Sequence, residues 1–144
     1  NNNMSNSFIE AAVKFKFNLK IGCPKKYSPS DKILKWASKN KSKIFVTKDP
    51  REAAKDADCI MTDKWVSMND KVNKKAKKKS LKEYQVNKKL FKLAKTDCIF
   101  MHCLPVGRGE EVADDIIDGN KSVVWQQAYN RVHAQKSIIN WCLN

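Results

Sequence analysis

Two short apolar runs in the sequence end in polar residues that could carry chemistry. Asp63 directly follows the run Cys59–Thr62, and the pair His102 and Cys103 directly follows Cys98–Met101. A carboxylate after a buried strand can bind an ammonium group or a metal ion, or it can cap a helix. Because a metal site needs several convergent ligands and Asp63 has no histidine partner, an ammonium-bearing ligand is the better prediction.

Histidine next to cysteine suggests a nucleophile pair, but their adjacency works against it. Neighbouring side chains of an extended chain point to opposite sides, so His102 is not expected to activate Cys103. Cys103 could instead accept or relay a proton, or pack beside a substrate. The structural alternative is a buried thiol next to a capping histidine. Arg131, one of three arginines, could reach an anionic or carbonyl oxygen, or lie on the surface.

These residues must be positioned by a chain in which short apolar runs alternate with helical patterns. Predicted strands cover the ranges Asn18–Ile21, Lys43–Thr47, Cys59–Thr62, Cys98–Met101 and Ser122–Trp125. Predicted helices cover the ranges Ser5–Phe17, Asp31–Asn40, Arg51–Lys55, Asn87–Lys95 and Gln127–Leu143. The alternation predicts an α/β fold with a doubly wound, mainly parallel sheet and helices on both of its faces. Ligands of such sheets bind beyond the carboxyl ends of the strands, where Asp63 and Cys103 are expected.

Length and composition fit a single globular domain of 144 residues, 42% of them hydrophobic and 31% charged. Lysine and arginine outnumber aspartate and glutamate by 29 to 15, which gives a net charge of +14. Almost all of this excess is lysine, whereas nucleic-acid contacts favour arginine, so the charge only weakly indicates a nucleic-acid partner. The run Lys71–Lys79 holds six lysines in nine residues. We expect it to be a solvated helix or mobile loop rather than an anion-binding patch.

Several other classes of protein do not fit the sequence. No apolar run approaches the ~20 residues of a membrane-spanning helix, and Asn1–Ser7 does not resemble a signal peptide. The five cysteines are odd in number and mostly widely spaced, and only Cys98, His102 and Cys103 cluster, which is too few for structural zinc. We therefore expect no metal, reduced and mostly buried thiols, and a cytoplasmic protein. The start of the chain is interpreted as a cut inside a longer polypeptide.

A set of motifs then indicates a family. In order, they are Asn1-Asn2-Asn3-Met4-Ser5-Asn6-Ser7, Asp63-Lys64-Trp65-Val66-Ser67-Met68, Tyr84-Gln85-Val86-Asn87, His102-Cys103-Leu104-Pro105 and Asn130-Arg131. Over essentially the whole chain, 1–144, they resemble the second, ornithine-binding domain of ornithine carbamoyltransferases. The resemblance implies a Rossmann-like domain that is incomplete at its N-terminus and is separated from the domain that binds carbamoyl phosphate. The chain departs from the family at Tyr129, which is usually glutamate, and at Asn69, which is often glycine.

The resemblance also implies an activity. Enzymes of this family transfer the carbamoyl group of carbamoyl phosphate to the δ-amino group of L-ornithine. The products are citrulline and phosphate, in arginine biosynthesis and in a step related to the urea cycle. No metal and no organic cofactor is needed, and the complete enzyme is expected to be a cytoplasmic homotrimer. These 144 residues alone are expected to be inactive.

The substrate-binding residues that the resemblance implies come from several motifs. Asn3 would bind the α-amino and carboxylate end of ornithine. Asp63 would hold the α-ammonium group, and the loop of Ser67 and Met68 would close over the amino-acid head. These residues favour an α-amino acid over a related amine such as putrescine or an acylated ornithine, which is the first alternative. A lysine-rich module that binds nucleic acid is the second.

The catalytic residues that the resemblance implies are Asp63, Cys103 and Arg131. Cys103 would lie beside the δ-amino group, and Leu104 would offer its backbone carbonyl to the reacting nitrogens. An alkyl amine has a pKa near ~10.4, so a proton must leave before attack, and Cys103 coupled to Asp63 could assist. Arg131 would contact the carbamoyl oxygen and stabilise the developing oxyanion.

Overall fold

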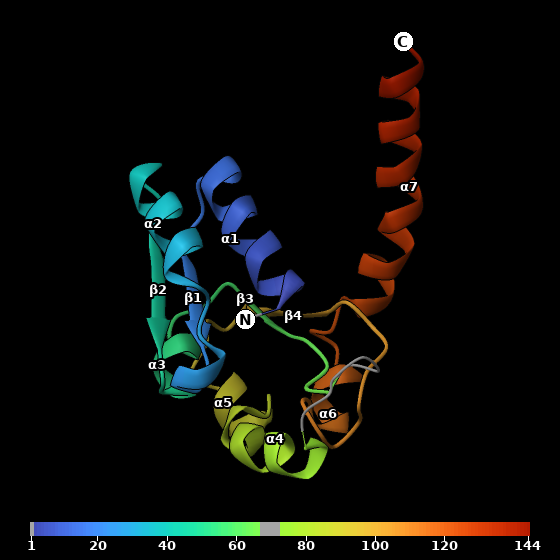
Figure 1. Cartoon of the computed structure of the whole chain (residues 1–144). Helices are drawn as coiled ribbons and strands as arrows, with labels where there is room; N and C mark the ends of the chain where they lie inside the picture. The colour runs from blue at the N-terminus through green and yellow to red at the C-terminus, as the bar shows by residue number, and fades with distance from the viewer. Residues whose placement is uncertain (1, 67–72) are drawn as a thin grey trace.

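The computed structural model describes residues 2–66 and 73–144, in which the strands form two parallel pairs (Figure 1). The strands are β1 (Leu19–Gly22), β2 (Ile44–Thr47), β3 (Cys59–Thr62) and β4 (Ile99–His102). β1 pairs with β2, and β3 pairs with β4. The predicted α/β class with parallel strands is confirmed, and these strands lie within one residue of their predicted bounds.

Helices connect the strands and cover them. They are α1 (Asn3–Phe15), α2 (Asp31–Lys39), α3 (Pro50–Ala54), α4 (Lys74–Leu81), α5 (Lys88–Phe91), α6 (Asp114–Ile117) and α7 (Val124–Leu143), with 3-10 turns η1 (Lys25–Tyr27) and η2 (Lys82–Tyr84). α1 and α2 pack against each other, α1 contacts β1, and α2 contacts β2. α3 contacts both of these strands and also α5. α7 contacts β4 and then extends away from the rest of the chain (Figure 1).

Local sequence explains where the first helices begin. The Asn2 side chain accepts a hydrogen bond of 2.8 Å from Ser5 N–H, and the Ser5 hydroxyl caps Asn2 in return, so α1 starts with a capping box. Asp49 caps α3 by accepting a hydrogen bond from Arg51 N–H, with Pro50 at the first helical position. α2 begins directly after Ser30, as expected, although the Ser30 hydroxyl makes no capping hydrogen bond.

The second strand pair carries most of the hydrophobic core. Ile60 lies opposite Phe100 and Thr62 opposite His102 in the parallel register. Ile60, Phe100 and His102 are buried, whereas Cys59 and Ile99 are exposed and Met61 and Met101 are only partly covered. One face of this pair therefore packs against the core cluster, which is Ala54, Ile60, Val86, Cys98, Phe100, Val112, Ile116, Ile117 and Val124.

The predicted fifth strand, Ser122–Trp125, is wrong. Ser122 forms only an isolated parallel bridge with Phe100, and Val123 N–H donates to the Phe100 carbonyl over 3.0 Å. The chain becomes helical at Val124, which is fully buried in the core cluster as the first residue of α7. Short apolar runs satisfy strand and helix patterns equally well, and here core packing selects the helix.

The lysine run and the cysteines also differ in part from expectation. Residues 74–79 belong to α4, in which Lys74 and Lys79 are exposed but Lys78 is half-buried and pairs with Glu110 at 2.5 Å. All five cysteines are free thiols, as expected. The expectation that most are buried is wrong, because only Cys98 is classed as buried. The thiols elsewhere lie near strand ends or on α7, where less of the chain covers them.

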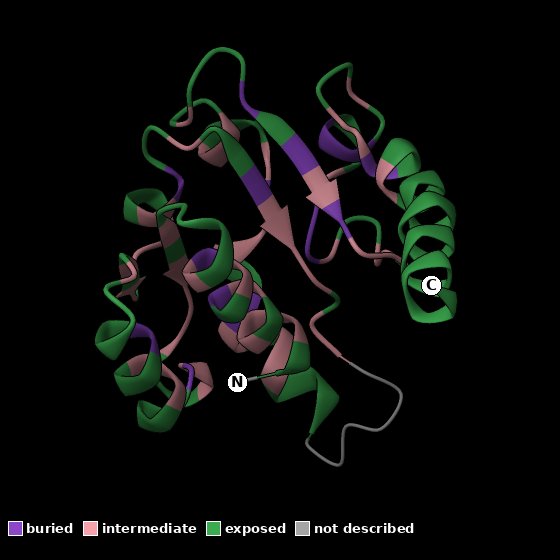
Figure 2. Cartoon of the chain, turned by 90° about the horizontal axis from the view of Figure 1, so that it is seen from above, coloured by how far each residue is buried: buried purple, intermediate pink, exposed green. Residues whose placement is uncertain are grey.

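The C-terminal helix α7 is exposed over nearly its whole length (Figure 2). Val124 is its one buried residue, and Trp141 is 80% exposed. Within the described residues, no helix combines the length and the apolar character needed to cross a membrane.

Candidate active site

The carboxyl ends of β3 and β4 bring the two strongest sequence candidates together. The Cys103 thiol donates a hydrogen bond to Asp63 Oδ1, with Sγ and Oδ1 3.1 Å apart. The two residues are 40 positions apart in sequence. They meet because parallel strands end at one edge of the sheet, and Thr62 lies opposite His102 in the register. The predicted proximity of Asp63 and Cys103 is therefore seen in the structure.

Asp63 has two further hydrogen bonds from described residues. Asn2 donates through its side-chain amide to Asp63 Oδ2 over 3.2 Å, and Lys64 N–H donates to Oδ1 over 2.7 Å. Asn3, the predicted ligand in this segment, is the first residue of α1 and is exposed. The start of α1 therefore lies against Asp63 through Asn2, with Asn3 adjacent. All of these partners are uncharged groups, so none of the described hydrogen-bond partners brings a positive charge to Asp63.

The environment of Cys103 keeps its thiol protonated. Burial and the hydrogen bond to Asp63 raise the pKa of Cys103 from 9.0 to about 12. Loss of the proton would place a second negative charge beside the Asp63 carboxylate, which is unfavourable. Nucleophilic cysteines have the opposite arrangement, a cationic neighbour that lowers the thiol pKa. Cys103 is thus suited to hydrogen bonding rather than to covalent catalysis.

His102 faces away from Cys103, as predicted. Its Nδ1 accepts a hydrogen bond of 2.9 Å from Leu104 N–H, so it caps the backbone that follows β4. Its Nε2 lies 3.4 Å from Glu111 Oε1, and both side chains are completely buried. Glu111 also accepts a hydrogen bond from Gly107 N–H. His102 is therefore a structural residue of the segment that carries Cys103.

Leu104 has an unusual backbone conformation directly after the thiol. Its φ of 54° lies in the left-handed region, and the bond to Pro105 is cis. A left-handed conformation in a non-glycine residue costs about 1–3 kcal/mol and is maintained only where surrounding contacts hold it. The hydrogen bond from Leu104 N–H to His102 is one such contact. Strained residues of this kind are found preferentially at functional sites, and the role of the Leu104 carbonyl stays a prediction.

Arg131 is not in contact with Asp63 or Cys103. Gln127, one helical turn before it on α7, accepts a hydrogen bond of 3.0 Å from His102 N–H and so fixes the start of α7 at the end of β4. Arg131 lies on the same side of the helix and is exposed. Tyr129, the departure from the family, is also exposed and stacks edge-on with His133 at 5.1 Å. Ser67, Met68 and Asn69 lie outside the described residues.

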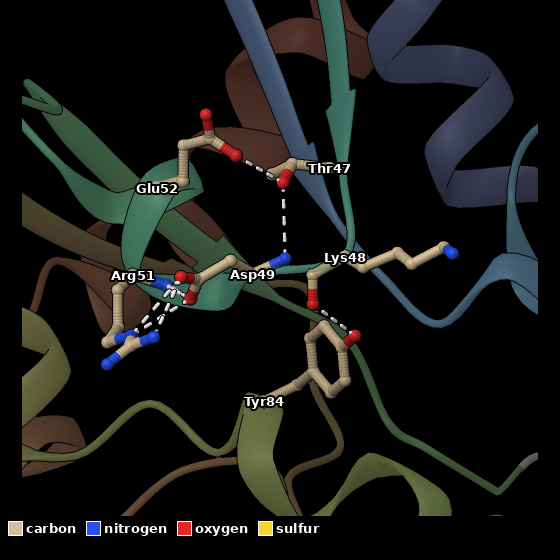
Figure 3. A network of polar contacts seen from close by, with 6 residues as sticks. All are labelled: Thr47, Lys48, Asp49, Arg51, Glu52 and Tyr84. Carbon is tan, nitrogen blue, oxygen red and sulfur yellow. Dashed lines mark hydrogen bonds and ion pairs between the residues drawn. The ribbon is translucent and has the colours of Figure 1, made fainter.

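The motif Tyr84-Gln85-Val86-Asn87 connects several segments through hydrogen bonds. The Tyr84 hydroxyl donates to the Lys48 carbonyl over 2.6 Å, just after β2 (Figure 3). Gln85 donates through its amide to the carbonyls of Gly109 and Glu110. Asn87 caps α5 by accepting from Leu90 N–H. The motif thus holds together the end of β2, helix α5 and the loop that leads to Glu111.

The described residues contain no cluster of three or more histidine, cysteine or acidic side chains placed to bind a metal ion. The site instead presents a carboxylate, a neutral thiol, a carboxamide and backbone groups, which suit a ligand that carries ammonium groups.

Comparisons with known proteins identify the family. The domain described as "Aspartate/ornithine carbamoyltransferase, Asp/Orn binding domain" matches residues 1–142. The chain belongs to this family. An ornithine carbamoyltransferase from Rhodopseudomonas palustris is 51% identical over 142 residues, which are 99% of this chain and 46% of that protein. The chain therefore spans about half the length of the curated relatives it matches.

Solved structures agree with the family assignment. The ornithine carbamoyltransferase of Pyrococcus furiosus superposes with a TM-score of 0.85 and 43% identity, covering 93% of this chain and 44% of that one. The anabolic ornithine carbamoyltransferase of Campylobacter jejuni gives a TM-score of 0.91 with 35% identity, covering 97% of this chain and 48% of that one. The carbamoyltransferase α/β fold is thus shared over nearly the whole chain.

Sequence reasoning missed three residues around this site. Asn2 was overlooked in favour of its neighbour Asn3, although an asparagine before a helical pattern is a recognisable N-cap signal. Gln127 gave no signal that it would accept a hydrogen bond from the end of β4. Glu111 gave no signal, because an acidic residue beside Glu110 and among loop residues is typical of a solvated surface.

Proposed function

We propose that residues 1–144 form the ornithine-binding domain of an ornithine carbamoyltransferase. The reaction is attack of the δ-amino group of L-ornithine on the carbonyl carbon of carbamoyl phosphate, which gives citrulline and phosphate in arginine biosynthesis. The observation that carries the proposal is the pair of Asp63 and Cys103 at the ends of two neighbouring parallel strands, in a chain of this family. Carbamoyl phosphate is assigned to a second domain, since the chain spans 46% of its relative's length.

Asp63 is assigned to the α-ammonium group of ornithine. Its described hydrogen-bond partners, Asn2, Lys64 N–H and Cys103, bring no positive charge to it. An ammonium group would therefore supply the missing countercharge and form a charge-assisted hydrogen bond. Asn3, Ser67 and Met68 are assigned to the amino and carboxylate end of the same substrate.

Cys103 and Leu104 are assigned to the reacting end. The δ-amino group must lose its proton before it can attack, and a thiol that stays neutral can accept a hydrogen bond from the amine without adding charge. The Leu104 carbonyl is a second acceptor, aimed by the left-handed backbone at that residue. Two acceptors orient the amine lone pair toward the carbamoyl carbon, and such orientation can lower a barrier by about 7–11 kcal/mol. The ammonium proton leaves to solvent before the attack, and the departing phosphate can take the N–H proton that is released once the new C–N bond has formed.

Arg131 is assigned to the carbamoyl oxygen, where negative charge develops. It lies one turn beyond Gln127, which is bonded to the end of β4. Closure of a second domain over the site would bring the carbamoyl group within its reach. We further infer a cytoplasmic enzyme whose complete form is a homotrimer, and a molar-mass measurement on that form tests the trimer directly.

Calorimetric titration of the 144-residue chain with L-ornithine tests the amino-acid site. Binding should be detected, and Asp63→Asn should weaken it by about 10- to 150-fold, since a charge-assisted hydrogen bond contributes about 1.5–3 kcal/mol. Asp58→Asn is the matched control, because Asp58 precedes β3, is exposed and pairs with Lys95. Tighter binding of putrescine or N-acetylornithine than of ornithine would overturn the substrate assignment.

A second experiment tests the division of labour between domains. The chain alone should form no citrulline from ornithine and carbamoyl phosphate, while addition of the separately expressed first half of the R. palustris relative should restore turnover. Turnover by the chain alone at ordinary enzymatic rates, about 1–1000 per second, would contradict the proposal. DNA retention across a salt series addresses the nucleic-acid alternative, which requires binding that survives competitor DNA.

A further inference from the structure

Glu111 is a charged side chain placed where charge is costly. Its side chain and that of His102 have no solvent exposure, and Glu111 Oε1 lies 3.4 Å from His102 Nε2. Burial alone would raise the pKa of Glu111, but the neighbouring His102 ring and the hydrogen bond from Gly107 N–H outweigh it and lower the pKa. Burying an ionised carboxylate costs several kcal/mol, and an apolar pair of similar volume is often as stable. Stability alone therefore gives little reason for a buried carboxylate at this position.

The backbone around Glu111 is anchored from outside the loop. Val86 N–H donates to the Glu111 carbonyl over 2.9 Å, and Ala113 N–H donates to the Val86 carbonyl over 2.9 Å. Gln85 holds the two preceding carbonyls, those of Gly109 and Glu110. The Tyr84-Gln85-Val86-Asn87 motif thus fixes the position from which the Glu111 side chain reaches inward.

The Glu111 carboxylate then contacts both sides of the Cys103 segment. It accepts a hydrogen bond from Gly107 N–H after the segment, and it faces His102 Nε2 before it. Because His102 Nδ1 accepts from Leu104 N–H, the ring proton must lie on Nε2, directed at Glu111. The carboxylate therefore selects the tautomer of His102 that can hold Leu104.

We propose that Glu111 and His102 form a buried positioning pair that fixes the Cys103–Leu104 segment for the amine. Neither residue touches the substrate. Glu111 orients the His102 ring, the ring holds Leu104 N–H, and Leu104 thereby keeps the left-handed backbone that directs its carbonyl and places the Cys103 thiol on Asp63. The effect on ornithine rests on the proposed function, whereas the effect on Cys103 does not.

The reactivity of Cys103 reports its position without any assay of turnover. The 144-residue chain is treated with iodoacetamide at about pH 8, and alkylation of each cysteine is followed by peptide mass spectrometry. Glu111→Gln removes the charge while keeping the shape. Released from Asp63, Cys103 should react about tenfold faster, since one unit of thiol pKa changes the thiolate fraction tenfold. Cys142, which is exposed on α7, is the internal control and should react at its wild-type rate.

Two more variants separate positioning from general damage. Glu110→Gln removes the adjacent carboxylate, which is half-buried and paired with Lys78, and should leave the Cys103 rate within about twofold of wild type. Gly107→Ala perturbs the same carboxylate from the other side, because a Cβ atom there would lie 2.8 Å from Glu111 Oε2. It should raise the Cys103 rate in the same direction as Glu111→Gln.

The outcomes are distinct. A Cys103 rate at or below that of wild type in folded Glu111→Gln and Gly107→Ala chains overturns the proposal. If Glu111→Gln does not fold, Gly107→Ala decides. If neither folds, Glu111 holds the fold rather than the segment, and the proposal is again overturned. Ornithine titration of the same variants should show weaker binding with the Glu110→Gln control unchanged. Absence of ornithine binding by the wild-type chain would defeat the proposed function while the thiol rates still decide the positioning pair.

Discussion

Asp49 and Asp63 occupy comparable places, each just beyond the carboxyl end of a parallel strand, yet their surroundings differ. The Asp49 carboxylate caps α3 and forms an ion pair with the Arg51 side chain, in which Arg51 Nη2 lies 3.0 Å from Asp49 Oδ2 (Figure 3). These contacts lower the pKa of Asp49. Asp63 has neutral partners instead, an amide, a backbone N–H and a thiol. The cation beside Asp49 thus completes a helix cap of the fold, whereas the described partners of Asp63 are all uncharged.

The two strand pairs also differ in how deeply they are buried. Phe100 in β4 is fully buried, whereas Phe45 in β2 is 45% exposed. Phe100→Ala should lower the free energy of unfolding by about 3–5 kcal/mol, because it leaves a cavity in the core cluster. Phe45→Ala should cost roughly 1–2 kcal/mol, in proportion to its partial burial. Urea unfolding of both variants measures the difference, and equal losses would show that the pairs are equally buried in solution.

Measuring both ornithine affinity and stability in urea tests the difference between the two aspartates. Asp63→Asn should weaken ornithine binding by about 1.5–3 kcal/mol and leave the urea midpoint close to that of wild type. Asp49→Ala should do the reverse, with a lower urea midpoint from the lost cap of α3 and unchanged ornithine affinity. Calorimetry and urea unfolding on both variants give the four values. Loss of ornithine binding in Asp49→Ala would remove the distinction drawn between the two sites.

Alkaline pH tests the thiol at the end of β4. The pKa of Cys103 is about 12 in the folded chain against 9.0 for a free thiol, so the unfolded chain loses this proton first. Stability should therefore fall as pH rises from about 9 toward about 12, and Cys103→Ala should reduce that fall.

Urea midpoints of wild type and Cys103→Ala are measured at several pH values between about 9 and about 12. Identical pH profiles for the two chains would contradict the raised pKa of Cys103.

The smallest expected effect concerns the lysines of α4. Lys78→Gln should lower stability by about 0.2–1 kcal/mol, because it breaks the pair with Glu110 that helps to anchor the loop beside β4. Lys79→Gln removes an exposed neighbour and should change stability by less than about 0.5 kcal/mol. Thermal unfolding of the two variants in parallel resolves the difference, and a larger loss for Lys79 would reverse the assignment of the anchoring lysine.

Sequence reasoning located the strands and the meeting of Asp63 with Cys103, because short apolar runs and the edge rule of parallel sheets are local signals. It could not find the burial of Glu111, which depends on His102 and on a loop held by Gln85 and Val86. Nor could it place the start of α7, since Val124 fits a strand pattern until the core cluster around it is known. Both features, the burial of Glu111 and the start of α7, depend on contacts between segments that are distant in sequence.

The partners of Asp63 come from widely separated parts of the chain, Asn2 lying 61 residues before it and Cys103 40 residues after it. Closing such long loops lowers the conformational entropy of the chain before the contact contributes any stability. Contacts of this kind therefore form slowly. Helix α1 and the first strand pair can therefore be in place while this carboxylate is still exposed. During synthesis, the pair cannot exist until Cys103 has left the ribosome. Quenching of Cys103 alkylation during refolding would thus mark the moment at which Asp63 and Cys103 meet, rather than the moment at which the chain becomes compact.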